Sequence, residues 1–317
     1  MKLLYITLLV LFVSCNTNIV KEYHENKRLK KEYTKVNGKL HGIYKEYYES
    51  GNLKSLYQYE YGLYKDSSLL FYDDKKQSLK FKELFLTNGH DSLYYYHPNG
   101  QLDAKGIVNK KDIRIGDWYF YREDGSMLQK LEYFDIAGQE YMNQRWRYTK
   151  DNKLMLSEGN FYELQTTFKD TVFVGQEVKL LFHLKRPLFA LNSRSFIILP
   201  VIREEFNKEF SNLKEIEHDT IFSLGEQGLH KNYDATNFSV AFSYVYSEPG
   251  IESIRGVLVE QIHQGMLPDK RIKSWLFTEK DTFDRKERKI YFDKKIYVKE
   301  NKKIDPKPLL KKEKERL

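Results

Sequence analysis

The chain has a single cysteine, Cys15, so no disulfide bond can form within it. Seven prolines and 17 glycines among 317 residues are too few for a collagen-like or low-complexity chain. The longest apolar run, residues 3–13, is too short to cross a bilayer, which needs about 20 residues. Motifs for a serine nucleophile, a zinc protease, a phosphate loop or a calcium loop are absent from the sequence. These absences predict a protein that is not an enzyme and needs no cofactor or metal.

The amino terminus predicts export. Lys2, an apolar stretch and then Ser14 and Cys15 have the order of a secretory signal peptide. The segment Leu11-Phe12-Val13-Ser14-Cys15 resembles the lipobox of bacterial lipoproteins. That resemblance implies removal of residues 1–14, acylation of Cys15 with palmitate-like chains and anchoring to a lipid bilayer. An ordinary secreted protein with an unused thiol is the alternative. The residues after Cys15 lack an acidic cluster, which favours the outer membrane facing the periplasm.

What the chain does have is aromatic residues and positive charge. It contains 25 tyrosines and 20 phenylalanines, residue types that suit β-strands, and its net charge is +8. Such a charge favours an anionic surface or an acidic partner, and nucleic acid is not expected for an exported protein. Positive residues are densest in residues 15–36, predicted to be a flexible tether, and in residues 301–317, predicted to be a disordered tail.

A repeat of about 25 residues runs through the first half. A tyrosine lies four residues before a turn residue in five places, at Tyr47, Tyr72, Tyr96, Tyr121 and Tyr148. The turn residues are Gly51, Lys76, Gly100, Gly125 and Asn152. Glycine and asparagine accept the positive φ of a three-residue hairpin loop, so the second turn, at Lys76, is expected to differ. We therefore predict about five antiparallel β-hairpins over residues 37–162, each paired with its neighbours.

The repeat also predicts which side chains share a face of the sheet. Three residues before the first four tyrosines come Tyr44, Leu69, Leu93 and Trp118, which are expected on one face. Tyr47, Tyr72, Tyr96 and Tyr121 are expected on the other, where they form a candidate binding face. The alternative is that these tyrosines only stack across strands and steady the sheet.

Two segments carry a family resemblance. Residues 37–54, NGKLHGIYKEYYESGNLK, and residues 116–125, GDWYFYREDG, resemble the bacterial variant of the MORN repeat. The resemblance implies an elongated hairpin array used for protein contacts, with no catalytic residue. Some bacterial members are antitoxins.

The second half reads as a β-sandwich over residues 163–300. Short apolar or alternating segments separated by turns are typical of that architecture. They are residues 171–184, 195–202, 238–246, 251–261 and 290–298. Val174-Gly175-Gln176-Glu177-Val178 and the Glu248-Pro249-Gly250 turn resemble bacterial immunoglobulin-like modules. Phe206, Phe210 and Leu213 share one helical face, which predicts a short helix over residues 203–213.

The sequence therefore favours a lipid-anchored bacterial envelope protein that acts as a scaffold for another envelope protein. Two alternatives remain open, a glycan or small-ligand binding module and an immunity protein. His90-Asp91 and His218-Asp219 are the pairs best suited to orient an imidazole or bind a metal, but such pairs are usually solvated turns.

Overall fold

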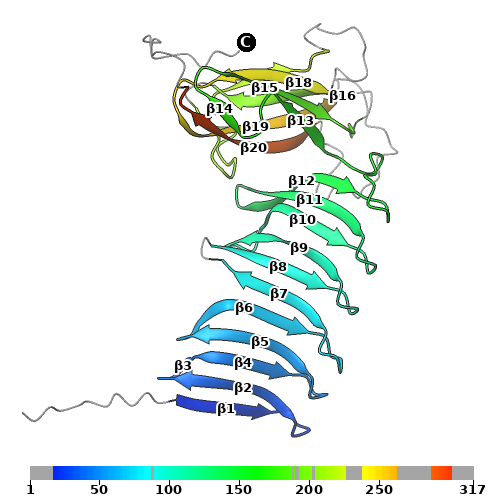
Figure 1. Ribbon diagram of the computed structural model, residues 1–317, viewed down its shortest axis with the longest axis vertical. Coiled ribbons are helices and arrows are strands. Elements are labelled where there is room, and N and C mark those ends of the chain that lie inside the picture. The colour runs from blue at the N-terminus through cyan, green and yellow to red at the C-terminus, as the bar shows by residue number, and fades with distance from the viewer. Residues whose placement is uncertain are drawn as a thin grey trace, which may run out of the picture. The chain divides into compact units, whose positions relative to one another are not determined.

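The computed structural model in Figure 1 describes residues 17–86, 89–187, 189, 193–201, 204–225, 238–262 and 287–301. Every regular element in these residues is a β-strand, which confirms the predicted mainly β fold. None of the described residues forms a helix long and apolar enough to span a membrane. Residues 1–14, Cys15 and residues 302–317 lie outside the described residues, so the leader, the lipidation site and the tail stay predictions.

The first twelve strands form one long sheet. Strands that follow one another along the chain are neighbours in the sheet, except that β3 pairs with β2 beside β4. The strands are β1 (Thr17–Tyr23), β2 (Leu29–Val36), β3 (Lys39–Leu40), β4 (Gly42–Tyr47), β5 (Leu53–Glu60), β6 (Leu63–Phe71), β7 (Leu79–Phe85), β8 (His90–Tyr96), β9 (Leu102–Asn109), β10 (Arg114–Tyr121), β11 (Met127–Ile136) and β12 (Gln139–Arg147). The hairpin array expected from the repeat is therefore present.

The turns follow the expected backbone chemistry. Gly51, Gly100 and Gly125 have φ values of 90°, 86° and 81°, and Asn152 replaces glycine with φ 56°. The second turn differs, as predicted. Its loop spans residues 72–78, whereas the first spans residues 48–52, and the positive φ falls on Gln77 rather than on Lys76.

The prediction of a flexible tether over residues 15–36 is wrong for its described part. Residues 17–36 form an additional hairpin, β1–β2, which pairs with β4 through β2. Its turn residue is Lys27, with φ 64°, so a lysine occupies the place of the repeat glycine. The charges that suggested a solvated tether are cross-strand partners, because Lys21 lies 3.3 Å from Glu32.

The expected face of the second repeat is also wrong. Leu69 pairs with Leu56, which in turn pairs with Lys45, so Leu69 lies on the face opposite Tyr44. Ser68, which is 4 % exposed, takes the position expected for Leu69. The repeat spacing assigned the positions of the second repeat one residue out of register, because the loop that follows β6 is longer than the first loop.

Two smaller sheets make up the second half. One has the order β13-β15-β18 and the other β14-β20-β19-β16-β17. The strands are β13 (Tyr162–Thr166), β14 (Thr171–Phe173), β15 (Glu177–Leu184), β16 (Ser193–Pro200), β17 (His218–Phe222), β18 (Ser239–Val245), β19 (Gly250–Ile262) and β20 (Glu287–Lys299). Phe182 and Phe242 from the first sheet share one buried core with Leu258 and Phe292 from the second. Two sheets packed over a common core form a β-sandwich.

The helix predicted over residues 203–213 does not form in its described part. Residues 204–213 form turns, in which the Asn207 and Asn212 side chains accept hydrogen bonds from the Ser211 and Asn207 backbone amides. Phe210 has a positive φ of 50°, which a helix cannot contain. Phe206 and Phe210 are buried as their spacing suggested, but they reach the core from a loop.

The contacts divide the chain into two units. One consists of residues 1–111 with 121–125, and the other of residues 112–120 with 126–317. The hairpin β11–β12 therefore belongs to the same unit as the sandwich. Within that unit, Tyr141 donates a hydrogen bond to the Lys289 carbonyl at 2.7 Å.

Candidate functional site

The four tyrosines of the predicted binding face end their strands but do not stack together. Tyr47, Tyr96 and Tyr121 are the last residues of β4, β8 and β10, whereas Tyr72 lies one residue beyond β6. All four side chains are half-buried. No ring contact among the four is present in the described part of the chain. Their backbone carbonyls have a structural role instead.

The carbonyls of Tyr47, Tyr96 and Tyr121 accept hydrogen bonds from the preceding hairpin. His24 Nε2 lies 2.9 Å from the Tyr47 carbonyl oxygen, and the Tyr72 hydroxyl lies 2.7 Å from that of Tyr96. Tyr48 makes the same contact with Phe71, at 2.8 Å. The residue that begins each of these loops therefore links one hairpin to the next. Tyr72 is therefore equivalent to Tyr48, the residue that begins the first loop, and not to Tyr47, the last residue of its strand.

The larger group of rings lies elsewhere on the array. Its members contact one another across β2 to β7, and we call this group the tyrosine cluster. It consists of Tyr33, Tyr44, Tyr57, Tyr59, Tyr64 and Phe85. Tyr33 stacks on Tyr44 with ring centroids 5.1 Å apart, and Tyr64 stacks on Phe85 at 5.5 Å. The repeat frame had identified only Tyr44, because the other members do not occupy equivalent positions in successive repeats.

A short charged row borders the tyrosine cluster. The Tyr33 hydroxyl donates to Glu22 at 3.0 Å, and Lys31 lies 3.9 Å from Glu22 and 3.8 Å from Glu46. Burial is the main cause that raises the pKa of Tyr33, and its hydrogen bond to Glu22 raises it further. Burial likewise raises the pKa of Tyr44 and Tyr59. The phenols therefore stay neutral at physiological pH, and the cluster is an aromatic surface with a paired polar border.

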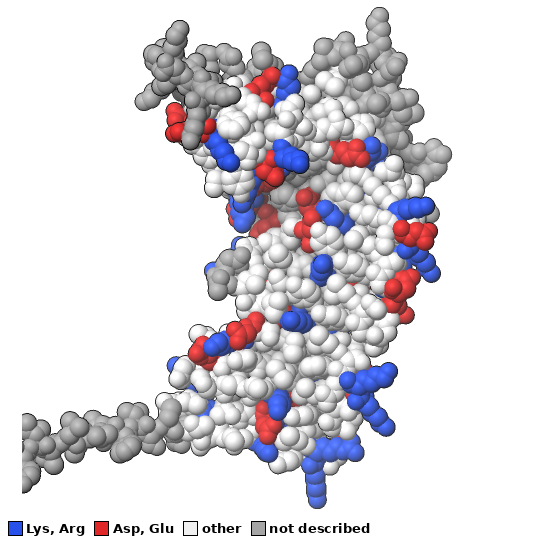
Figure 2. Space-filling view, viewed as in Figure 1, with Lys and Arg blue, Asp and Glu red and all other residues white. Residues whose placement is uncertain are grey.

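One end of the tyrosine cluster is exposed. Tyr64 is 56 % exposed, and the neighbouring Tyr61 and Leu63 are 55 % and 74 % exposed. An exposed tyrosine is typical of protein contact surfaces, because its ring contributes a large contact area with few rotatable bonds. Figure 2 shows positive and negative side chains interspersed over the face in view, so the net charge is not gathered there in one patch.

The two histidine–aspartate pairs lie at separate places. His90 and Asp91 begin β8, and His218 and Asp219 begin β17. Across the described residues, no three His, Cys, Asp or Glu side chains are grouped so that they could hold a metal ion.

The hairpin formed by β4 and β5 carries the features of a known repeat. A glycine with positive φ begins β4, Gly42 at 81°, and another lies in the loop between β4 and β5, Gly51 at 90°. Residues 40–61 match a MORN repeat variant. Among curated proteins, none matches the chain. The MORN repeat thus covers β4, its turn and β5, and three members of the tyrosine cluster, Tyr44, Tyr57 and Tyr59, lie within it.

Proposed function

We propose that this protein is a lipid-anchored lipoprotein of a bacterial envelope whose hairpin array is a non-enzymatic scaffold for another envelope protein. The observation that carries the scaffold is the exposed end of the tyrosine cluster at Tyr64, next to the matched MORN repeat. Tyrosine is among the residues that contribute most to protein interfaces. The lipobox-like segment ending at Cys15 supports the anchor, at the outer membrane facing the periplasm.

The anchor is tested by feeding cells a fatty acid that carries an alkyne. The full-length chain is expected to incorporate the label and to sediment with membranes, and the Cys15→Ser variant to do neither. Equal labelling of both proteins, or a soluble unlabelled mature form, would contradict the anchor.

The scaffold is tested by photo-crosslinking in intact cells. A benzoylphenylalanine at Tyr64, which is 56 % exposed, is expected to give one discrete crosslinked protein. The matched control is the same replacement at Tyr297, a tyrosine of β20 that is 47 % exposed. If Tyr64 gives no product, or the same products as Tyr297, the array is not the contact surface.

A glycan-binding module is the second candidate, and the exposed ring of Tyr64 is the observation that favours it. It has less support, because Tyr33 and Tyr44 turn their ring faces toward each other at an interplanar angle of 17°. Binding on a glycan array that is lost in Tyr64→Ala would favour this candidate over the scaffold.

We further propose that the sandwich is an immunoglobulin-like module. The order of its strands supports this: the first, third and sixth strands form one sheet, and the second, eighth, seventh, fourth and fifth form the other, in that order.

A further inference from the structure

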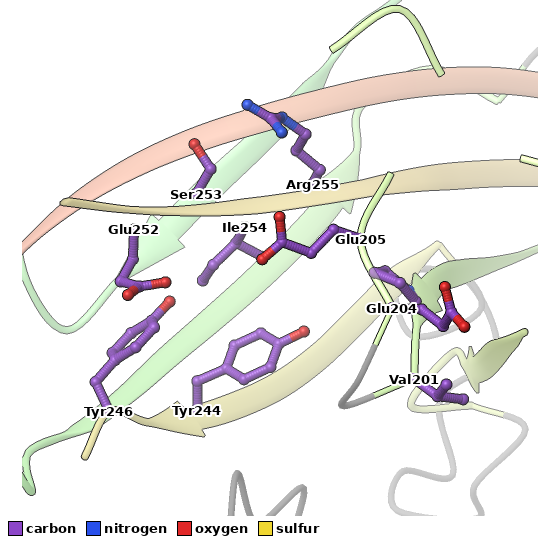
Figure 3. Close-up of a pocket in the computed structure, with 10 residues that line it drawn as sticks. Val201, Glu204, Glu205, Tyr244, Tyr246, Glu252, Ser253, Ile254 and Arg255 are labelled. Carbon is purple, nitrogen blue, oxygen red and sulfur yellow. The ribbon is translucent and has the colours of Figure 1, made fainter. Parts of the chain in front are cut away.

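An open pocket lies in the sandwich, where β18 ends and β19 begins. It encloses about 500 Å³, including space open to solvent. Figure 3 shows the side chains of Tyr246 and Glu252 close together with Glu205 beyond them, whereas Glu204 lies at the other end of the pocket and points away from them. The lining residues used in the argument are Glu204, Glu205, Tyr244, Tyr246, Glu252 and Arg255.

The pocket has an excess of negative charge. Glu204, Glu205 and Glu252 line it, and within the described chain none of the three has an ion-pair partner. The one cation in the lining, Arg255, is already paired. Its Nε lies 2.9 Å from an Asp293 carboxylate oxygen, and its guanidinium also donates to the Phe206 carbonyl at 3.2 Å. The carboxylates are therefore not neutralised by Arg255.

A largely buried tyrosine adds a second, independent feature. Tyr246 is only 7 % exposed, and its hydroxyl makes no hydrogen bond to any described residue. In Figure 3 its ring points from the end of β18 toward Glu252. Burial raises the pKa of Tyr246 and of Tyr244, so both phenols are neutral. The hydroxyl is not among the buried side-chain atoms that lack a partner, so it is open to the pocket, where a ligand can reach it.

We propose that this pocket binds the guanidinium of an arginine side chain presented by a partner protein, an inference that builds on the scaffold function proposed above. A planar guanidinium donates hydrogen bonds to carboxylates in pairs and stacks on aromatic rings. Glu205 and Glu252 supply the acceptors, and the Tyr246 hydroxyl supplies another. Tyr244, which is partly buried and packs against Tyr246 with ring centroids 6.3 Å apart, supplies the aromatic surface.

The probe is N-acetylarginine amide, titrated into the full chain with ¹³C-labelled tyrosine rings and followed by NMR. We expect saturable shifts of the Tyr244 and Tyr246 signals. Glu252→Gln removes one carboxylate from the pocket and is expected to weaken binding about five- to tenfold. The matched control is Glu248→Gln, an exposed glutamate in the turn before β19 that does not line the pocket, and it is expected to leave the affinity unchanged.

Several outcomes would overturn the proposal. Equal binding of N-acetylcitrulline amide, the neutral analogue, would show that charge is not recognised. Tighter binding of putrescine would assign the pocket to a free diamine instead of a protein side chain, and saturation of the same signals by Ca²⁺ alone would assign it to a metal. Equal weakening by Glu252→Gln and Glu248→Gln would place the effect outside the pocket. The two proposals can fail separately. If Tyr64 gives no crosslink but N-acetylarginine amide still binds, the array is not the scaffold and the arginine site in the sandwich pocket remains supported.

Discussion

At the residue scale, Asn143 joins the last hairpin to the sandwich. It is 1 % exposed, its Nδ2 donates to the Tyr291 carbonyl at 2.8 Å, and its Oδ1 accepts from the Tyr291 amide at 2.8 Å. The same Nδ2 also donates to Glu132 at 2.6 Å. One side chain on β12 thus satisfies both backbone groups of a residue on β20.

Asn143→Ala is expected to lower the free energy of unfolding by about 2–3 kcal/mol, because the buried Tyr291 amide and carbonyl lose their partner. Urea denaturation followed by circular dichroism measures the change. Gln139→Ala, at an exposed position on the same strand, is the control and should cost less than about 0.5 kcal/mol. Equal effects of the two substitutions would mean that the Asn143 contacts do not hold the hairpin.

Glu132 makes stability depend on pH. Burial raises the pKa of its carboxyl, although hydrogen bonds from Gln144 and Asn143 oppose the shift. The folded state therefore keeps this proton to higher pH than the unfolded chain. The contribution of Glu132 to the free energy of unfolding falls as pH rises from about 4.3, the ordinary value, through the raised value of the folded protein.

Glu132→Gln removes this titration and keeps a side-chain oxygen that can accept from Asn143. The stability of the variant relative to the natural protein should increase between pH 4 and pH 8. Urea midpoints of both proteins at several pH values give the comparison. A difference that does not change with pH would contradict the assignment.

At the element scale, the turn glycines act through backbone conformation alone. Gly100 has φ 86°, and a Cβ built on it would meet nothing within 4 Å. Gly100→Ala is therefore expected to cost about 1–2 kcal/mol through strain alone, and Gly100→Asn less, because asparagine tolerates this region. Thermal unfolding of the two variants separates the effects. Equal losses of stability in the two variants would indicate that position 100 has no room for a side chain.

How far the sequence predicted each element depended on its turn. The hairpins with Gly51, Gly100 and Gly125 were predicted because glycine accepts positive φ at low cost. The turn at Asn152 was predicted for the same reason, but an isolated bridge between Tyr148 and Leu154 closes it in place of a strand pair. The hairpin β1–β2 was missed because its turn residue is Lys27, although Tyr23 lies four residues before it as the repeat requires. The helix over residues 203–213 was predicted from the spacing of its apolar residues alone. A loop that buries two phenylalanines can have the same spacing.

The surfaces were less predictable than the strands. The tyrosine cluster combines Tyr33, Tyr57 and Tyr64 through strand register, and a periodic frame does not show which residues pair. The sandwich pocket brings Glu205 toward Tyr246 and Glu252, from which β17 and β18 separate it along the chain. Neither group has a local motif, so both were invisible until the pairing was known.

At the scale of the whole molecule, the chain consists of two units with different sources of stability. In the first unit, hairpins are stabilised mainly by their neighbours, as in other repeat proteins. The second unit has the shared sandwich core, and β11 and β12 belong to it through Asn143 and Tyr141. The boundary therefore falls within the repeat array, and not at the start of the sandwich.

Phe182→Ala tests this division. Phe182 is fully buried, with ring centroids 4.5 Å from Phe292 and 5.7 Å from Phe242, so its truncation should cost about 3–5 kcal/mol. Hydrogen exchange read by mass spectrometry should show lost protection in β13 to β20 and also in β11 and β12, with β1 to β8 unchanged. Retained protection of β11 and β12 would assign that hairpin to the first unit, and a uniform loss along the chain would mean that the two units unfold as one.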